Sequence, residues 1–333
     1  MASTKRIAIL SDIHYASAAE QARGNDFELT PISNPALRGL VRFYRHVIWL
    51  REPLQQNHLL DSFLARDAGW DFVIANGDYS CDSASVGVSD NAACESVEQC
   101  LGKLRAKFGS RLRITYGDHE LGKTSFFGGR GGMRLASWHR ARQELGLEPF
   151  WKVTAGKYVL IGVVSSLIAL PVFEADTLPA ERAEWERLRE AHLGEIRKAF
   201  SGLETEQRVL LFCHDPSGLP FLWHEPEVQS KVGQIEQTII GHLHSKLVLW
   251  KSGWLAGMPR IRFLGHTANR LSAALRQARH WRPFKVRLCP SLAGIELLKD
   301  GGYLTAELDL EGTRPAKFEL HPLPRKRMPE FCG

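Results

Sequence analysis

An acid and a histidine, one residue apart, follow the first apolar run of this chain. Residues 7–10 predict a buried strand, and Asp12 and His14 come directly after it. Because side chains two residues apart on an extended backbone point to the same side, this carboxylate and imidazole can reach one metal ion together. Such pairs also occur in turns that hold no metal, so the motif alone establishes no function.

The same arrangement recurs along the chain. Strands predicted at 71–75, 112–116, 208–212 and 237–240 also end in an acid or a histidine. The full set at these strand ends is Asp12, His14, Asp78, Asp118, His119, His214, His242 and His244. Carboxylates and imidazoles together suit Mn, Fe or Zn and disfavour an all-oxygen calcium site. Two ions bridged by one carboxylate would use the whole set.

At two of these strand ends the directions of the side chains are informative. His242 and His244 lie two residues apart after a strand, so both imidazoles point to one side, and this is the most specific local signal in the chain. Cys213 beside His214 suggests a thiol nucleophile, but adjacent residues on a strand face opposite sides. We therefore interpret Cys213 as a packing residue.

The elements that position these residues alternate between strand and helix. Helices are predicted over 56–68, 94–107, 133–145 and 180–200. Three successive strand–helix units imply a parallel sheet with helical crossovers. Further strands are predicted as a hairpin over 150–165, as a second hairpin over 295–310 with its turn at 300–302, and near 317–320.

Composition bounds the class of protein. A chain of 333 residues with 44% apolar content can bury a large core. It has no apolar run of membrane-spanning length, and its start, MASTKRIAIL, is too short in apolar residues for a secretory signal. Its six cysteines lack metal-type spacing. We expect a cytoplasmic protein. The net charge of +6 indicates affinity for nucleic acid, anionic lipid or a phosphorylated substrate.

Two basic regions extend the predicted single domain, which covers residues 1–333. The first is a helical insertion at about 35–68, in which Arg38, Arg42 and Arg45 recur at helical spacing. It could lie on an anionic membrane, grip an acidic substrate or be a core helix with a solvated face. The second is a C-terminal extension at about 251–333. No acid occurs between Glu236 and Glu296, where the bases are Lys246, Lys251, Arg260, Arg262, Arg270, Arg276, Arg279, Arg282, Lys285 and Arg287.

Two local predictions concern this basic character. The glycine loop FFGGRGG, residues 126–132, carries Arg130, which could bind a substrate phosphate by charge-assisted hydrogen bonds. A helix is predicted over 269–281, with Arg276 and Arg279 exposed. Both features could instead be a simple loop and a solvated surface.

Taken in order, five motifs resemble the calcineurin-like metallophosphoesterases over about residues 6–250. They are D-x-H at 12–14, G-D at 77–78, G-D-H-E at 117–120, a lone histidine at 214 and G-H-x-H at 241–244. The resemblance implies an α/β fold, an αββα sandwich of two mixed sheets with helices on the outer faces. It implies that Asp12, His14 and His244 hold one metal, that His214, His242 and Asp118 hold another, and that Asp78 bridges them.

The activity that the resemblance implies is phosphoester hydrolysis by a hydroxide held between two divalent or mixed-valence ions. His119 would be catalytic, as an acid or as a stabiliser of phosphoryl charge, and Glu120 would orient its neighbours. One residue departs from the family, which usually has Asn where this chain has Asp118. The added negative charge would favour an ion such as ferric iron or weaken phosphate binding.

Other functions stay open at this stage. A phosphorylated small molecule is the expected partner, and the basic regions admit nucleic acid or an anionic membrane surface. One alternative is a non-catalytic metal-binding interaction module, against which the retained His119 argues. Another is a hydrolase of nucleic acid or of a lipid-linked pyrophosphate. The branch that cleaves diacylglucosamine nucleotides usually has Arg in place of His119.

Overall fold

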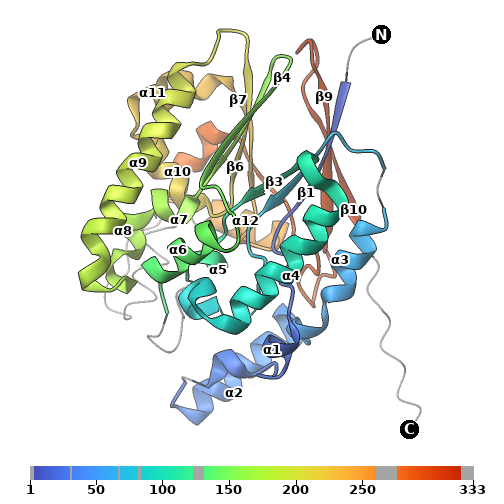
Figure 1. Ribbon diagram of the computed structural model, residues 1–333, viewed down its shortest axis with the longest axis vertical. Coiled ribbons are helices and arrows are strands. Elements are labelled where there is room, and N and C mark those ends of the chain that lie inside the picture. Colours follow the sequence, from blue (N-terminus) through green and yellow to red (C-terminus); the bar gives the residue numbers. More distant parts are fainter. Residues whose placement is uncertain are drawn as a thin grey trace.

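The described chain forms two five-stranded sheets surrounded by helices (Figure 1). The computed structural model describes residues 4–30, 32–66, 68–81, 84–122, 131–254, 256–257, 259 and 276–323. The first sheet has the order β10-β9-β1-β2-β3, and the second has the order β4-β5-β6-β7-β8. The strands are β1 (Thr4–Leu10), β2 (Phe72–Asn76), β3 (Leu112–Thr115), β4 (Phe150–Ala155), β5 (Tyr158–Val163), β6 (Arg208–Cys213), β7 (Ile235–Ile240), β8 (Val286–Leu288), β9 (Gly302–Asp309) and β10 (Lys317–Pro322).

Both sheets are mixed, as predicted. In the first sheet β1, β2 and β3 are parallel, whereas β9 is antiparallel to β1 and to β10. In the second, β5 to β8 are parallel and β4 forms the predicted hairpin with β5. Helices α3 (Asn57–Leu64) and α4 (Asn91–Phe108) carry the chain between parallel strands of the first sheet. The carboxyl ends of parallel neighbours therefore meet at one edge.

Alternate side chains of a strand pack in different layers. Ile7 and Ile9 of β1 lie between the sheets, in one cluster with Phe212 of β6. Ala8 and Leu10 point the other way, into a cluster with side chains of α3 and α4. All are fully buried, and burying a side chain such as Ile or Leu contributes about 1.5–3 kcal/mol. Because side chains alternate along β1, one face of the strand packs against the second sheet and the other face packs against helices.

The outer face of the second sheet is covered by α9 (Arg182–Ser201), α10 (Leu219–Trp223) and α11 (Pro226–Lys231) (Figure 1). Phe200 of α9 belongs to the same buried cluster as Leu211 of β6. The layers therefore run helix, sheet, sheet, helix. This confirms the predicted αββα sandwich.

The remaining helices lie in the connections. They are α1 (Ala18–Gln21), α5 (Asp118–Leu121), α6 (Leu135–Gln143), α7 (Ser165–Ile168), α8 (Leu170–Phe173) and α12 (Lys246–Trp254), with a 3-10 helix η10 (Ala278–Phe284). Within the described part of the chain, no helix combines the length and the apolarity that crossing a membrane requires.

The helix predicted within residues 35–50 forms in two parts. α2 (Pro35–Tyr44) begins after Asn34, whose side chain accepts hydrogen bonds from two backbone N–H groups of the first turn. It continues as a π-helix, η2 (Arg45–Trp49). π-helical turns are rare and often occur at functional sites.

The C-terminal third differs from the prediction. Residues 295–299 form no strand. The hairpin is instead β9 with β10, and β9 also pairs with β1. Asp300 is the reason, because its side chain accepts hydrogen bonds from the Ile295 backbone and the Ser245 hydroxyl and so closes a tight turn. β8 was not predicted, because three residues in a basic stretch carry too little pattern.

Two further predictions fall wholly or partly on residues that are not described. Arg130 and the part of its glycine loop at 126–130 lie outside the described residues. The described chain resumes at Gly131. Of the helix predicted over 269–281, residues 276–281 are described, and those from Ala278 form the 3-10 helix η10. The range 251–333 also supplies β8, β9 and β10 to the two sheets.

Candidate metal centre

The predicted ligands come from five strand ends and meet between the two sheets. Asp12 and His14 follow β1, Asp78 follows β2, and Asp118 follows β3. From the second sheet, His214 follows β6, and His242 and His244 follow β7. All seven side chains lie in two groups that could each hold a metal ion. The structure therefore brings together every residue that the sequence predicted as a ligand.

The backbone leaves three of these strands, β1, β2 and β7, by an unusual turn. Positive φ angles of 50° to 58° occur at Asp12, His14, Asp78, His242 and His244. A left-handed residue other than glycine costs about 1–3 kcal/mol, and Asp and His are among the side chains that tolerate it best. Backbone hydrogen bonds from Asp12 N to Gly77 O (3.0 Å) and from His14 N to Asp78 O (3.1 Å) hold the loops in place. The turned loops aim their side chains into the space between the sheets.

Two glycines in the motifs are required by crowding. A Cβ atom on Gly117 would lie 2.0 Å from Oδ1 of Asp78. A Cβ atom on Gly241 would lie 2.0 Å from Oγ of Ser11 and 2.5 Å from Oδ2 of Asp12. Any side chain at either position would displace a candidate ligand. This explains physically why glycine precedes the polar residue in these motifs.

The two groups share one carboxylate. The first group is Asp12, His14, Asp78 and His244, and the second is Asp78, Asp118, His214 and His242. Within each group the ligand atoms lie within 4.8 Å of one another. Asp78 is the member common to both. It is 1% exposed, so its charge needs partners inside the protein.

The distances fit metal coordination. Nε2 of His244 lies 3.2 Å from Oδ1 of Asp12, and Nε2 of His214 lies 3.1 Å from Oδ2 of Asp78. Ligands that each lie about 2.1 Å from one ion are about 3 Å apart. Nε2 of His214 is buried, and the groups beside it are other candidate ligands, Oδ2 of Asp78 and, at 3.5 Å, Oδ1 of Asp118. A buried imidazole nitrogen that faces carboxylates is suited to share a metal ion with them.

The histidines of the first group are suited to bind a metal as neutral ligands. Burial lowers the pKa of His14 well below its usual value, and the neighbouring His119 and His244 lower it further. Burial also lowers the pKa of His244. Nδ1 of His14 lies 3.1 Å from the Ser80 carbonyl, to which it donates, and this leaves Nε2 for an ion.

The histidines of the second group differ. Burial lowers the pKa of His242, but the Asp118 carboxylate, whose Oδ1 lies 3.0 Å from Nδ1, outweighs it and raises the pKa to about 10. Burial likewise opposes protonation of His214, yet Asp78 and Asp12 raise its pKa well above the usual value. Without metal, both imidazoles of the second group are therefore protonated at neutral pH.

This asymmetry predicts how metal binding depends on pH. An ion entering the second group must displace the protons of His214 and His242, whereas His14 and His244 have none to lose. Metal-free protein should therefore release at least about two protons on full loading at pH 7, and the affinity of the second group should rise more steeply with pH than that of the first. Titration calorimetry with Mn²⁺ in buffers of different ionisation enthalpy measures this release.

The matched variant for that titration is Asp118→Asn. It keeps an oxygen beside His242 but removes the charge that raises the histidine's pKa, so about one fewer proton should be released. Equal release by both proteins would show that Asp118 does not control His242. Release of no protons by the original protein would contradict the assignment of both histidines.

His119 lies beside both groups and belongs to neither. Its Nδ1 lies 2.9 Å from the Ser80 carbonyl, and its Nε2 lies 3.8 Å from Oδ2 of Asp78. Its ring centroid is 4.8 Å from that of His14. Burial lowers its pKa, but Asp78 and Asp118 raise it to about 9. Without metal, a protonated imidazole therefore lies next to the shared carboxylate.

Glu120 holds the loops rather than entering either group. Its buried carboxylate accepts backbone hydrogen bonds from Gly117 (2.7 Å), Asp78 (3.1 Å) and Tyr79 (2.9 Å). These bonds tie the end of β3 to the end of β2. This geometry agrees with the orienting role that the sequence suggested.

Two residues next to candidate ligands were not predicted as ligands themselves. The Trp49 ring, at the end of η2, lies with its centroid 4.8 Å from that of His244. Its place in an amphipathic helix was the only sequence signal for this residue. Cys213 is fully buried in the outer cluster of the second sheet, on the side opposite His214. Burial raises the pKa of this thiol far above its usual range, which agrees with the packing role.

The chain is similar to known proteins in sequence and in fold. A family model described as calcineurin-like phosphoesterase matches residues 5–246. No curated protein matches the chain. Among solved structures, a dimetal phosphatase from Danio rerio is 13% identical with a TM-score of 0.43, covering 91% of this chain and 92% of that one. A purple acid phosphatase from yellow lupin (Lupinus luteus) is 12% identical with a TM-score of 0.38, covering 73% of this chain and 38% of its own.

These structural likenesses are too weak to carry an argument about function. The family match does not depend on them. It spans well over half of the chain and includes every strand end that supplies a residue to the two groups. The chain therefore belongs to the calcineurin-like phosphoesterase family.

Proposed function

We propose that this chain is a dinuclear metal-dependent phosphoesterase that hydrolyses a phosphomonoester or a phosphodiester. The observation that carries the proposal is that two four-residue groups of candidate ligands share Asp78. One shared carboxylate can keep two ions about 3.5–4 Å apart, the spacing of two-metal hydrolases. The adjacent His119 supplies a group for proton transfer that neither ion needs as a ligand.

The donor set favours first-row ions. Carboxylates mixed with imidazoles suit Mn, Fe or Zn. When bound, such ions polarise phosphoryl oxygens and lower the pKa of water to near neutrality. Asp118 adds a third carboxylate to those of Asp12 and Asp78, and this charge favours a more highly charged ion, such as ferric iron, in the second group.

We assign proton transfer to His119. Its Nδ1 is held by the Ser80 carbonyl, which fixes the ring and directs Nε2 toward the shared carboxylate. The imidazolium can then give its Nε2 proton to the leaving-group oxygen as the ester bond breaks. Its buried position, 7% exposed, keeps bulk water from supplying that proton instead.

The proposed substrate is a phosphorylated small molecule, and the proposed setting is the cytoplasm. Cys94, Cys100, Cys213 and Cys289 are buried thiols, which agrees with a reducing compartment. Phosphate recognition by Arg130 stays a prediction.

Metal analysis combined with a substrate panel tests the proposal. Protein purified without chelator and reloaded with Mn, Fe or Zn should hold about two ions per chain and turn over a monoester or a diester. A chelator should abolish this turnover. Pyrophosphate and DNA complete the panel. Fewer than one ion per chain would contradict the dinuclear centre, and two ions without turnover on any substrate would favour a non-catalytic module.

A further inference from the structure

The helix α2 and the π-helix η2 present their apolar side to solvent. The exposed fractions are 66% for Leu40, 59% for Phe43, 48% for Val47 and 46% for Tyr44. Val41 is the buried residue of α2. A helix on a globular protein normally turns its apolar stripe inward. Here that stripe is left for another partner.

The same helix is held by the segment that precedes it. Val41 packs with Leu29 and Ile32, and three arginines bind that segment, although Arg42 stays 63% exposed. Arg42 and Arg45 pair with Asp26 (2.9 Å) and Glu28 (2.5 Å), both close to the 3-10 helix that precedes α2. Arg38 donates to the Ile32 carbonyl. These contacts fix the rotation of α2 about its axis. The outward apolar stripe is therefore built into the fold.

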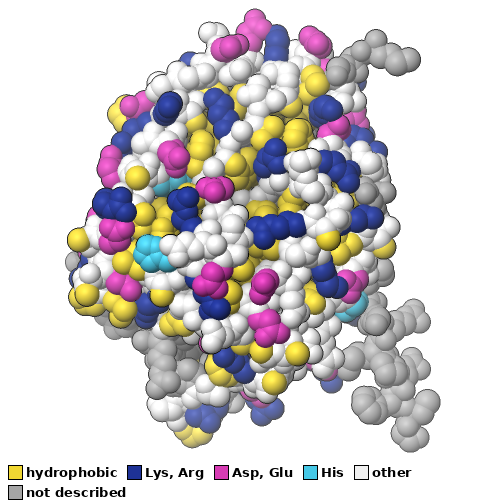
Figure 2. Space-filling view, in the orientation of Figure 1, with side chains coloured by type: hydrophobic (Ala, Val, Ile, Leu, Met, Phe, Trp, Pro, Cys, Tyr) yellow, Lys and Arg dark blue, Asp and Glu magenta, His cyan; other side chains and the backbone are white. Residues whose placement is uncertain are grey.

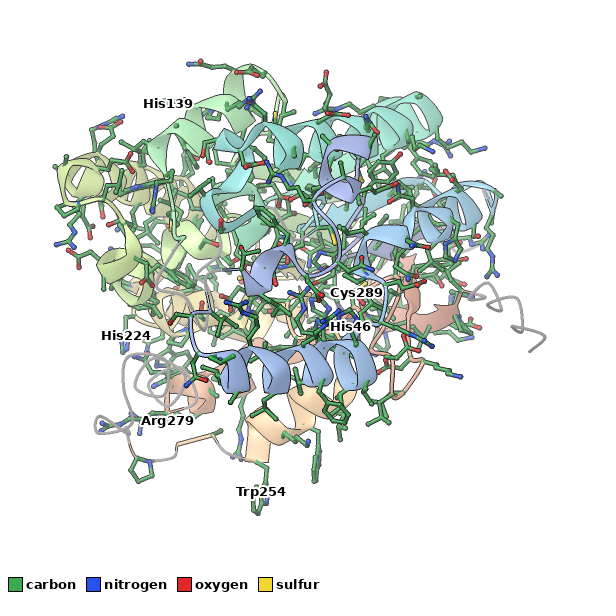
Figure 3. All side chains as sticks on the ribbon, turned by 90° about the horizontal axis from the view of Figure 1, so that it is seen from below. His46, His139, His224, Trp254, Arg279 and Cys289 are labelled. Atoms are coloured by element: carbon green, nitrogen blue, oxygen red, sulfur yellow. The ribbon has the colours of Figure 1, made fainter. Side chains whose placement is uncertain are left out.

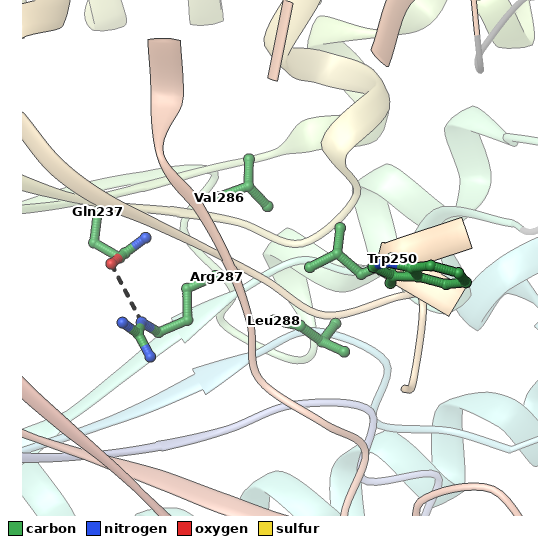
Figure 4. A pocket seen from close by; sticks show the side chains of 6 residues that line it. Gln237, Trp250, Val286, Arg287 and Leu288 are labelled. Atoms are coloured by element: carbon green, nitrogen blue, oxygen red, sulfur yellow. Dashed lines mark hydrogen bonds between the residues drawn. The ribbon is translucent and has the colours of Figure 1, made fainter. Parts of the chain in front are cut away.

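A second exposed apolar face comes from α12. Trp254 is 80% exposed, Trp250 is 65% exposed and Leu247 is 37% exposed. Figure 3 shows Trp254 pointing away from the body of the molecule, on the side of the view where α2 also lies. Trp250 also lines a groove of about 320 Å³ with Val286 and Leu288 of β8 (Figure 4).

The turn at 295–299 joins these two faces. Leu297 is 63% exposed and Leu298 is 41% exposed. The turn is bound to η2 by a 2.7 Å hydrogen bond from Glu296 N to the Trp49 carbonyl. On its other side, Ser245 next to α12 donates to Asp300 at 2.7 Å.

We call these three segments the apolar rim. Its members are Leu37, Leu40, Phe43, Tyr44, Val47, Leu247, Trp250, Trp254, Leu297 and Leu298. Of the large hydrophobic residues that are exposed in the described chain, Leu178 alone lies outside it. The rim borders the metal centre, because the tilted rings of Trp49 and His244 are in contact, with their centroids 4.8 Å apart. An exposed apolar patch of this kind marks an interaction surface.

The charge around the rim selects the partner. Residues 29–51 contain four arginines and no acid, and no acid occurs between Glu236 and Glu296. Because Arg42 and Arg45 are paired internally, attraction would come from exposed bases near α12 and η10, namely Lys251, Arg276 and Arg279, and from Lys299. Figure 2 shows basic and acidic side chains interspersed with hydrophobic ones over the face seen in Figure 1.

We propose that the apolar rim docks on an anionic lipid bilayer. Leu, Phe and Trp side chains suit the boundary between headgroups and acyl chains, and the bases suit anionic headgroups. A nucleic acid would leave the leucines unmatched, and a second copy of the chain would bring like charges together. Docking would place the metal centre next to the headgroup layer. The proposal concerns the surface and does not rest on hydrolysis.

Vesicle sedimentation with the full chain tests the proposal. Vesicles of phosphatidylcholine with about 30% phosphatidylglycerol should bind the protein, pure phosphatidylcholine should bind it far less, and about 0.5 M salt should weaken binding. The double variant Leu40→Glu with Phe43→Glu should bind at least about tenfold more weakly. Trp254→Glu should weaken binding in the same direction. The matched control is Leu178→Glu, an exposed leucine outside the rim, which should bind as the original does.

Metal content and thermal unfolding of each variant distinguish lost docking from lost folding. No binding to anionic vesicles at low salt would overturn the proposal, as would equal loss in the Leu178→Glu control. Dimerisation in analytical ultracentrifugation that the Leu40→Glu, Phe43→Glu variant abolishes, without vesicle binding, would assign the rim to a second copy. Binding to DNA without binding to vesicles would likewise overturn it.

Discussion

Replacing His119 with Ala should leave about two metal ions per chain and reduce turnover by roughly 10²–10⁴-fold, the usual contribution of an acid–base residue. The metal content should persist because neither ligand group contains this side chain. The turnover should fall because the Nε2 proton beside Asp78 is lost. Steady-state kinetics at saturating metal, with metal content measured on the same samples, checks both outcomes.

The leaving group makes this test more specific. A poor leaving group, such as an alkyl alcohol, needs protonation more than a nitrophenolate does, so the loss should be larger for the alkyl ester. An equal loss for both esters would instead assign His119 to stabilising charge on the phosphoryl oxygens. His139→Ala, which removes an exposed histidine of α6 (Figure 3), is the control and should behave as the original. Full turnover by His119→Ala would remove this residue from the mechanism.

Replacing Asp78 with Asn should have the larger effect, because it changes both ligand groups at once. Metal content should fall from about two ions per chain to one or fewer. Bound metal supplies several kcal/mol of transition-state stabilisation, and about 1.36 kcal/mol corresponds to a tenfold rate change, so turnover should fall by at least about 10³-fold. Asn keeps the oxygen that accepts the hydrogen bond from His119 N (3.1 Å), so the loops should stay in place.

Elemental analysis and thermal unfolding with and without metal measure this second effect. A ligand at 1,000 times its Kd stabilises the folded state by about 4.1 kcal/mol, so the metal-induced rise in Tm should shrink. Asp71→Asn is the matched control at the opposite end of β2, where the carboxylate pairs with Lys5 at 2.6 Å. It should keep both ions. Two ions and turnover within tenfold of the original for Asp78→Asn would show that Asp78 is not the shared ligand.

The local sequence determined which residues could form a metal centre. An apolar run with a period of two predicts a strand, and the residues that directly follow a strand lie at its carboxyl end. Asp12 and His14 after β1, and His242 and His244 after β7, could therefore be named from spacing alone. The parallel order of β1, β2 and β3 followed from the helices between them.

Only the tertiary structure decided how these residues combine. The family resemblance implied that Asp78 is shared by both groups, but the physical cause is the face-to-face packing of the two sheets, which no local pattern states. The hairpin predicted over 295–310 was wrong, because Asp300 closes a turn through Ser245, more than 50 positions away in the chain. The same holds for Trp49, whose contact with His244 joins residues on separate elements.

The direction of α2 illustrates the limit most clearly. Its sequence shows an apolar stripe and a basic stripe, and such a pattern is the same whichever stripe faces the protein. The tertiary structure decides through Val41, which packs with Leu29 and Ile32. The acids Asp26 and Glu28 pair with Arg42 and Arg45, and Leu40 and Phe43 stay exposed. Local periodicity thus specifies what a helix offers on each side, whereas long-range pairing determines which side is left for a partner.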